Sequence, residues 1–312
     1  MGYVVIGIIL CFSSASCYLA SARPMLVSGS PSSNKMATQR SRAPAGPRVF
    51  LPIAQENNND VNQVAGWATT LHPYFGSRSK MSIWGSSQEH SQESGASITI
   101  YSGSEQESFN CIQAGFHVFP DWYNSSDAHF FVYWTRDGFQ STGCTNLRCP
   151  GFVPAKGAAL VPGQAIAPSV YGGKDRYITI SLYMDPSTGG DWVLYREDLA
   201  TPSFLGHFPK ELFTNMNDGA DLGWFAFVDY RKNERGPPMG SGHFPREGER
   251  KAAYFKKIQI FDSEANAYDL RPGQSDLTRV FTQQECYNVS EVLQTKHDGS
   301  VFYYGGPSGC AI

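Results

Sequence analysis

Short runs of alternating apolar and polar residues, each closed by a turn cluster, are the feature that most constrains how this chain can fold. The clearest run covers residues 177–184, where every second residue is Ile, Leu or Met and shares one face of a strand. Turn clusters such as Ser-Gly-Ser at residues 102–104 separate such runs. With 31 Gly and 19 Pro among 312 residues, the chain is interrupted too often for a helical bundle.

The sequence predicts an all-β fold, an antiparallel β-sandwich or barrel with very little helix. One segment has helical character, because Pro209 is suited to the first turn of a helix. Leu212, Phe213 and Met216 follow at helical spacing. The remaining strands are predicted from alternation and short apolar runs. They cover residues 81–84, 97–101, 112–119, 129–134, 223–228, 254–261 and 301–304.

The N-terminus has the pattern of a targeting signal. Residues 4–12 are apolar and are followed by small residues with an Ala-Ser-Ala cleavage site, so residues 1–22 are typical of a secretory signal peptide. A buried N-terminal strand is the alternative. Residues 23–64 are rich in Ser, Pro, Asn and Ala and are predicted to be a flexible linker or a remnant pro-segment. Residues 65–312 are then the folded domain of a secreted, extracellular protein.

Five cysteines remain after the predicted signal, and an odd number in an oxidising compartment indicates two disulfides and one unpaired thiol. They are Cys111, Cys144, Cys149, Cys286 and Cys310. A short-loop disulfide between Cys144 and Cys149 is favoured over a metal site, because no second cysteine pair has zinc spacing. The sequons at Asn124 and Asn288 are compatible with glycosylated surface loops.

The charge balance and the motifs that the sequence lacks exclude several function classes. With 25 Lys and Arg against 28 Asp and Glu, the formal charge is −3, and no basic block indicates a nucleic-acid surface. After the signal, no stretch approaches the roughly 20 apolar residues of a membrane span. The sequence has no phosphate-binding loop, nucleophile elbow or histidine pair at metal-ligand spacing, so it predicts no cofactor and no metal.

Eight strings in a fixed order carry a family resemblance. They are IQAGF (112–116), FVYWTRDGFQ (131–140), TGCTNLRCPGF (142–152), LGHFP (205–209), MGSGHFP (239–245), KAAYF (251–255), CYNV (286–289) and YYGGP (303–307). Together they closely resemble the neprosin family, secreted plant proteins whose active members are glutamic peptidases that cleave after proline. The resemblance runs from about residue 65 to the C-terminus.

The resemblance implies two stacked antiparallel sheets with a concave cleft, in agreement with the predicted strands. It also implies the disulfides Cys144–Cys149 and Cys286–Cys310, which leaves Cys111 as the free thiol. The implied partner is a peptide or protein substrate or ligand, with proline-rich chains among the candidates. No nucleic-acid partner is expected, and no membrane partner after removal of the signal.

The catalytic pair of the family is incomplete in this sequence. Active neprosins use two glutamates, one that activates water and one that stabilises the oxyanion and protonates the leaving amine. The first position matches Gln113, which alternation directs away from the apolar face of its strand, and whose amide can donate a hydrogen bond but cannot take up a proton. The second position, aligned on Trp224, is Phe227, which has no proton chemistry.

Asp229 offers a substitute carboxylate, because it shares the strand face of Phe227 about 6.6 Å further along. Two functions therefore remain open. One is an active acidic endopeptidase that uses Gln113 with Asp229. The other is a descendant with impaired or lost catalysis that binds a peptide or a cell-wall component. Four aromatic residues either line its groove or fill the sandwich core. They are Tyr133, Trp134, Trp224 and Phe227.

Overall fold

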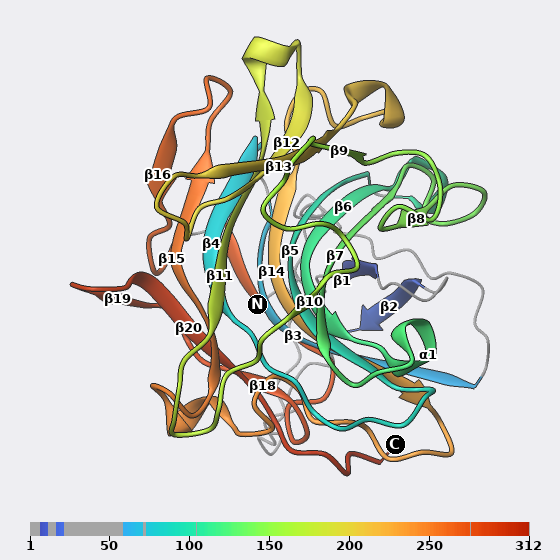
Figure 1. The fold of residues 1–312 in the computed structure, drawn as a ribbon, viewed down its shortest axis with the longest axis vertical. Coiled ribbons are helices and arrows are strands. Elements are labelled where there is room, and N and C mark those ends of the chain that lie inside the picture. Colours follow the sequence, from blue (N-terminus) through green and yellow to red (C-terminus); the bar gives the residue numbers. More distant parts are fainter. Residues whose placement is uncertain are drawn as a thin grey trace, which may run out of the picture.

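Two large antiparallel sheets packed face to face make up most of the protein. The residues that the computed structural model describes are 7–11, 17–21, 59–70, 73–103, 105–274 and 276–311. Figure 1 shows the two sheets, with β5, β6 and β7 on the right and β4, β11 and β15 on the left. The prediction of an all-β antiparallel sandwich is confirmed.

Sheet I contains Gln113 in β6 and Phe227 in β14. Its strand order is β10-β7-β6-β5-β14-β3-β17, and β8 pairs with β7. Its strands are β3 (Asp60–Thr69), β5 (Glu93–Ser102), β6 (Asn110–Val118), β7 (Ala128–Thr135), β8 (Cys144–Thr145), β10 (Ala165–Ile166), β14 (Asp221–Arg231) and β17 (Leu277–Phe281).

Sheet II covers one face of sheet I. Its strand order is β18-β20-β15-β4-β11-β12-β13-β9, while β16 pairs with β15 and β19 with β20. Its strands are β4 (Gly76–Ser82), β9 (Val153–Pro154), β11 (Tyr177–Asp185), β12 (Asp191–Arg196), β13 (Ser203–Phe208), β15 (Ala253–Phe261), β16 (Ala267–Asp269), β18 (Asn288–Val289), β19 (Leu293–Thr295) and β20 (Gly299–Gly305).

The main hydrophobic core lies between the two sheets. Ile178, Ile180 and Leu182 of β11 belong to it, as the alternation of that strand predicts. The indole Nε1 of Trp224 on β14 donates a hydrogen bond to Oγ of Ser77 on β4, 2.9 Å away, and so joins the two sheets inside the core. The N–H group of the buried indole therefore has a hydrogen-bond partner.

Helical structure is confined to single turns. The helix predicted from Pro209 onward is wrong: the segment forms only the 3₁₀ turn η3 (Lys210–Leu212), and the backbone is extended at Phe213. Asn110 holds the following loop, because its Oδ1 accepts from the backbone N–H of Thr214 at 2.8 Å. The other short helices are η1 (Gln106–Ser108), α1 (Pro120–Tyr123), η2 (Pro186–Thr188) and η4 (Pro245–Glu247). Across the described part of the chain, no helix has the length and apolar character of a membrane span.

The predicted N-terminal segments fall mostly outside the described residues. Of the predicted signal peptide, residues 1–22, the structure describes the hairpin of β1 (Gly7–Cys11) and β2 (Cys17–Ser21). Of the predicted linker, residues 23–64, it describes only the end, where β3 begins at Asp60. Sheet I therefore begins five residues before the predicted domain boundary.

Two disulfides close loops at the edges of the sheets. Cys144 is bonded to Cys149, and Cys286 is bonded to Cys310, which are the pairs that the resemblance implied. Cys111 is a buried free thiol. Of the sequon residues, Asn124 is exposed at the C-terminus of α1 and Asn288 lies half-buried in β18.

Candidate functional site

Sheet I has a second apolar cluster on its outer face, the face turned away from sheet II. Alternation along the strands divides the four aromatic residues singled out in the sequence: Trp134 and Trp224 pack in the core between the sheets, and Tyr133 and Phe227 lie on the outer face. The buried members of the outer cluster are Val64, Ala68, Tyr101, Phe109, Cys111, Phe131, Tyr133, Phe225, Phe227 and Val280.

Gln113 lies in the middle of β6 on this outer face and is 2% exposed. The register pairs it with Tyr133 of β7 on one side and with Thr99 of β5 on the other. Thr99 in turn pairs with Gly223 of β14. The β14 residue straight across from Gln113, two strand spacings or about 10 Å away, is therefore a glycine without a side chain.

An aromatic ring fills the space above Gly223. A Cβ atom added to Gly223 would lie 2.0 Å from Cε2 of Phe225. One added to Gly66 of β3 would lie 2.8 Å from Cδ1 of the same ring. Phe225 thus packs over both glycines, and the position that faces Gln113 across β5 is occupied by hydrocarbon rather than by a proton acceptor.

Phe227 lies further along β14 than the residues in register with Gln113, which we call the level of Gln113. It pairs with Gly95 of β5, and Gly95 pairs with His117 of β6. A Cβ atom on Gly95 would lie 2.7 Å from Cζ of Phe227, so this ring covers Gly95. His117 and Gln113 are four residues apart, about 13 Å along the strand. Along β14, Phe225 is therefore nearer than Phe227 to the level of Gln113.

Asp229 lies still further from Gln113. It pairs with Glu93 of β5, and Glu93 is six residues, about 20 Å, from the Thr99 level of Gln113. The register therefore separates Asp229 from Gln113 by six residues along the sheet as well as by two strand spacings across it. Directly paired residues on neighbouring strands have Cβ atoms about 5 Å apart, so Asp229 and Glu93 place two carboxyl groups side by side.

A buried hydrogen-bonded chain holds Glu93 in place. Nδ1 of His117 lies 2.6 Å from Oε1 of Glu93, and Nε2 lies 2.8 Å from the hydroxyl of Tyr123. Nδ2 of Asn146 donates to the same hydroxyl at 2.9 Å. Both ring nitrogens are satisfied when Tyr123 donates to Nε2 and the Nδ1–H group donates to Glu93. Burial raises the pKa of Tyr123 to about 12, so its proton is retained.

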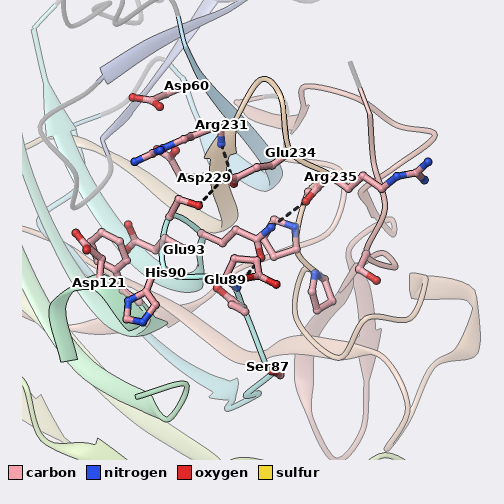
Figure 2. A pocket seen from close by; sticks show the side chains of 18 of the residues that line it. Asp60, Ser87, Glu89, His90, Glu93, Asp121, Asp229, Arg231, Glu234 and Arg235 are labelled. Carbon is pink, nitrogen blue, oxygen red and sulfur yellow. Dashed lines mark hydrogen bonds between the residues drawn. The ribbon is translucent and has the colours of Figure 1, made fainter. Parts of the chain in front are cut away.

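A cavity of about 780 Å³ opens beside the two carboxyl groups (Figure 2). Two loops that meet at its rim are tied together, because Oγ of Ser91 donates to Oε1 of Glu234 at 2.6 Å and Nε2 of Gln92 donates to the carbonyl of Arg235 at 2.9 Å. Acidic groups predominate in the lining. The charged lining residues are Asp60, Glu89, Glu93, Asp121, Asp229, Arg231, Glu234 and Arg235.

Asp221 is the carboxylate of β14 that lies nearer to the level of Gln113, two residues from Gly223. Its side chain is turned toward β3, where Oγ1 of Thr69 donates to its Oδ1 at 3.4 Å. Burial raises the pKa of Asp221 to about 7, the hydrogen bond from Thr69 opposes this, and the nearby charge of Asp276 adds to it. Asp221 is therefore directed away from β5 and from Gln113.

Sequence reasoning missed Glu93 and His117. The alternation of β6 already places His117 on the same face as Gln113. Glu93 has no comparable signal, because only the pairing of β5 with β6 and β14 brings it to His117 and Asp229. Within the described ranges, no cluster of three or more His, Cys, Asp or Glu side chains has an arrangement that could hold a metal ion.

The fold and this face define a two-sheet β-sandwich protein with a polar pocket at one end of an aromatic sheet face. The family model for neprosin matches residues 90–307. This chain therefore belongs to the neprosin family, and the resemblance inferred from the ordered strings is confirmed.

Three solved structures are similar to this chain. Two are scytalido-glutamic peptidase, one with a peptide-based transition-state analogue (10% identity, TM-score 0.41, covering 80% of this chain and 99% of that chain). The other contains a transition-state analogue inhibitor (10% identity, TM-score 0.38, covering 78% and 98%). The third is SCP-B, a member of the eqolisin family of peptidases, in complex with the tripeptide Ala-Ile-His (11% identity, TM-score 0.38, covering 78% and 98%).

Proposed function

We propose that this protein is a peptide-binding member of a glutamic-peptidase family in which hydrolysis at the family's catalytic position is impaired or lost. The observation that carries the proposal is the pair Gly223 and Phe225, which leaves hydrocarbon opposite Gln113. Peptide hydrolysis by this route needs a group that takes a proton from water. An amide cannot do so, and loss of a positioned base typically lowers the rate about 10²–10⁴-fold.

A groove beside Gln113 supports peptide binding. It has a volume of about 390 Å³ and includes Tyr133, the cross-strand neighbour of Gln113. The Tyr133 and Phe139 rings are stacked with centroids 4.9 Å apart, and the Arg148 guanidinium lies 4.0 Å from the Trp122 ring. Aromatic-lined grooves accept extended proline-containing segments, whose rigid backbone loses little entropy on binding. A proline-containing peptide is the ligand class that these features favour.

The test combines a binding and a cleavage measurement at acidic pH with one proline-containing peptide. The native protein is expected to bind the peptide by calorimetry and to leave it intact by mass spectrometry. Trp122→Ala and Phe139→Ala are expected to weaken binding, whereas Arg136→Gln, at an exposed position outside the groove lining, is expected to leave the affinity within about twofold. Cleavage by the native protein that disappears in Gln113→Ala would overturn the proposal.

Two matched variants test the position of the missing base. Phe225→Glu introduces a carboxylate two residues, about 6.6 Å, from the level of Gln113, and Phe227→Glu introduces one four residues, about 13 Å, from that level. Any gain of peptide cleavage is expected only in Phe225→Glu. A gain confined to Phe227→Glu would contradict the register on which the proposal rests.

A second candidate function is acid hydrolysis at the other end of the same face. It is favoured by one observation, the cross-strand pair of Glu93 and Asp229 at a cavity of about 780 Å³. Two adjacent carboxyl groups that share a proton can act as acid and base. If this candidate is correct, Asp229→Asn and Glu93→Gln each abolish cleavage at acidic pH, and Gln113→Ala does not. The candidate is rejected if the native protein leaves the peptide intact.

We also propose that the protein is secreted, with residues 1–22 removed and the chain glycosylated. The exposed position of Asn124 and the two disulfides are compatible with an extracellular location. Expression in a eukaryotic secretory host is expected to give protein in the medium that lacks residues 1–22 and shifts on deglycosylation. Asn124→Gln and Asn288→Gln assign the glycan, and an unshifted, cell-retained protein would reject this proposal.

A further inference from the structure

A strip of aromatic rings crosses the outer face of sheet II, on the side of the molecule away from sheet I. It consists of Phe261 of β15, Tyr183 of β11, Tyr195 of β12 and Phe204 and His207 of β13. Successive ring centroids are 4.5, 6.1, 5.1 and 6.4 Å apart. From β15 to β13 the strip spans four strand spacings, about 19 Å.

The strip is continuous because of a glycine. β4 lies between β15 and β11, and its residue opposite Tyr183 is Gly76. A Cβ atom on Gly76 would lie 2.3 Å from Cβ of Tyr183, and its φ of 145° also disfavours other residues. A larger residue at this position would separate Tyr183 from Phe261, whose rings are now parallel within 13°.

Most of these rings lie outside the core, whereas Phe261 is 3% exposed and has the Arg78 guanidinium 5.5 Å from its ring. Tyr183 and Tyr195 alternate with Leu182 and Leu194, which face sheet I. Phe204 is 37% exposed, and the rings of Tyr183, Tyr195 and His207 are partly exposed. Aligned, partly exposed rings on an open sheet face are unusual for a surface without a ligand.

Polar groups border the strip, and two of them are tyrosine hydroxyls. The hydroxyls of Tyr183 and Tyr195 have no hydrogen-bond partner among the described residues. Both hydroxyls remain protonated, because burial raises the pKa of Tyr183 to about 12 and also raises that of Tyr195. Glu197 and Asp185 lie close enough to influence the Tyr183 hydroxyl, and Glu197 also pairs with Arg78 at 3.1 Å.

The geometry points to an uncharged polysaccharide chain as the ligand of this strip. The C–H face of a sugar ring packs on an aromatic ring, while its hydroxyls need donors and acceptors at the border, which the tyrosine hydroxyls and carboxylates supply. The border carboxylates Asp185, Asp191 and Glu197 disfavour nucleic acids and anionic polysaccharides. An extended peptide is disfavoured, because the backbone groups of β11 and β12 are already paired within the sheet and cannot accept another strand.

Affinity electrophoresis of the full chain tests the inference, with gels that contain hydroxyethylcellulose, xylan or glucomannan, or the anionic polymer polygalacturonate. Retardation is expected in at least one of the three uncharged polymers and is expected to persist at high salt, because no net charge is involved. Phe204→Ala and Tyr195→Ala are each expected to weaken binding about tenfold through loss of stacking. Tyr195→Phe, which keeps the ring and removes the hydroxyl, is expected to lose less.

Tyr177→Ala is the matched control. Tyr177 is an exposed aromatic residue of the same strand face as Tyr183 but lies six residues, about 20 Å, outside the strip. Its loss is expected to leave retardation unchanged, and thermal unfolding of each variant checks that the fold is intact. The inference is overturned by the absence of retardation in all three uncharged polymers, by equal weakening in Tyr177→Ala and Phe204→Ala, or by retardation only in polygalacturonate that salt removes.

Discussion

The two ends of the outer face of sheet I are built from the same three strands, β6, β5 and β14, yet they have opposite character. At one end, the residues in register are Gln113, Thr99 and Gly223, beneath the ring of Phe225. Six residues along β5 and β14, Glu93 and Asp229 face each other at a polar cavity. The aromatic end holds Gln113, and the acidic end holds the carboxyl pair.

This difference shows that the position of a residue along its strand, and not only the strand and face to which it belongs, decides which side chains are close enough to react together. A carboxylate two residues from a catalytic position shares its face but lies about 6.6 Å away, and one six residues away lies about 20 Å away. Direct proton transfer requires hydrogen-bond distances of about 3 Å. The two ends therefore act as separate sites, and the following variants test that separation.

The largest effect is expected where a buried hydrogen bond between two polar side chains is broken. His117→Leu removes the partner that Glu93 has at 2.6 Å, and both side chains are almost fully buried. Removing one partner of this buried hydrogen bond to a carboxyl group is expected to lower the free energy of unfolding by about 2–3 kcal/mol in urea titrations. Gln113→Leu, the matched change on the same strand face, is expected to cost about 1 kcal/mol. If both variants lost the same free energy of unfolding, the Glu93–His117 hydrogen bond would contribute no more to stability than the side chain of Gln113.

The level between the two ends is expected to tolerate little added volume. Gly95→Ala would bring a Cβ atom to 2.5 Å from the carbonyl oxygen of Phe116 and to 2.7 Å from Cζ of Phe227. The resulting displacement is expected to destabilise the protein by about 1–3 kcal/mol. Gly85→Ala is the control, since its nearest neighbour would be at 3.4 Å. A Gly95→Ala protein as stable as the Gly85→Ala protein would contradict this packing.

Asp221, at the aromatic end of β14, is expected to make stability fall as the pH rises. Its folded pKa of about 7 lies above the value of 3.8 that applies to an unperturbed carboxyl, so the folded state binds the proton more tightly between these values. Stability is therefore fully present below about pH 4 and is lost as the pH rises through 7. Allowing for solvent screening, Asp221→Asn is expected to gain about 2 kcal/mol at pH 8 and nothing at pH 4. Urea unfolding at both pH values measures this, and a gain that is the same at both would refute the assignment.

The smallest effect is expected at the rim of the aromatic end. Phe139→Ala removes a ring that stacks on Tyr133 at 4.9 Å but is only partly buried. The expected cost is about 1 kcal/mol, because aromatic pairs contribute about 0.5–1.5 kcal/mol beyond burial. Thermal unfolding beside Gln140→Ala provides the measurement. A loss above about 3 kcal/mol would mean that this ring belongs to the folding core and not to a binding groove.

Much of the fold could be predicted from local patterns, but several elements could not. Alternation identified the strand that contains Ile178, Ile180 and Leu182, and it assigned Gln113 to the face opposite the apolar residues of β6. It missed β12, β13 and β17, whose edge positions or bulges weaken the period. It also suggested a helix after Pro209, where the loop is instead held by Asn110 from a distant part of the sequence.

The candidate site was predictable only in its residue types. The ordered strings align Gln113 and Phe227 with the two glutamate positions of the family, so the sequence predicted that neither position carries a glutamate. It did not indicate that Phe225, rather than Phe227, lies over the place opposite Gln113, nor that Asp229 has Glu93 as its neighbour. Those relations depend on the register of β5 with β6 and on the pairing of β5 with β14, a strand far from it along the chain.

By itself, the amino-acid sequence determined the family, the two-sheet architecture and the face of each strand on which a side chain lies. A period of two residues is a local property that any strand carries with it. Only the tertiary structure decided which levels of neighbouring strands meet, because register depends on turns, bulges and packing over the whole sheet. That alignment separates Gln113, which faces an aromatic ring across β5, from a pair of acids at a cavity.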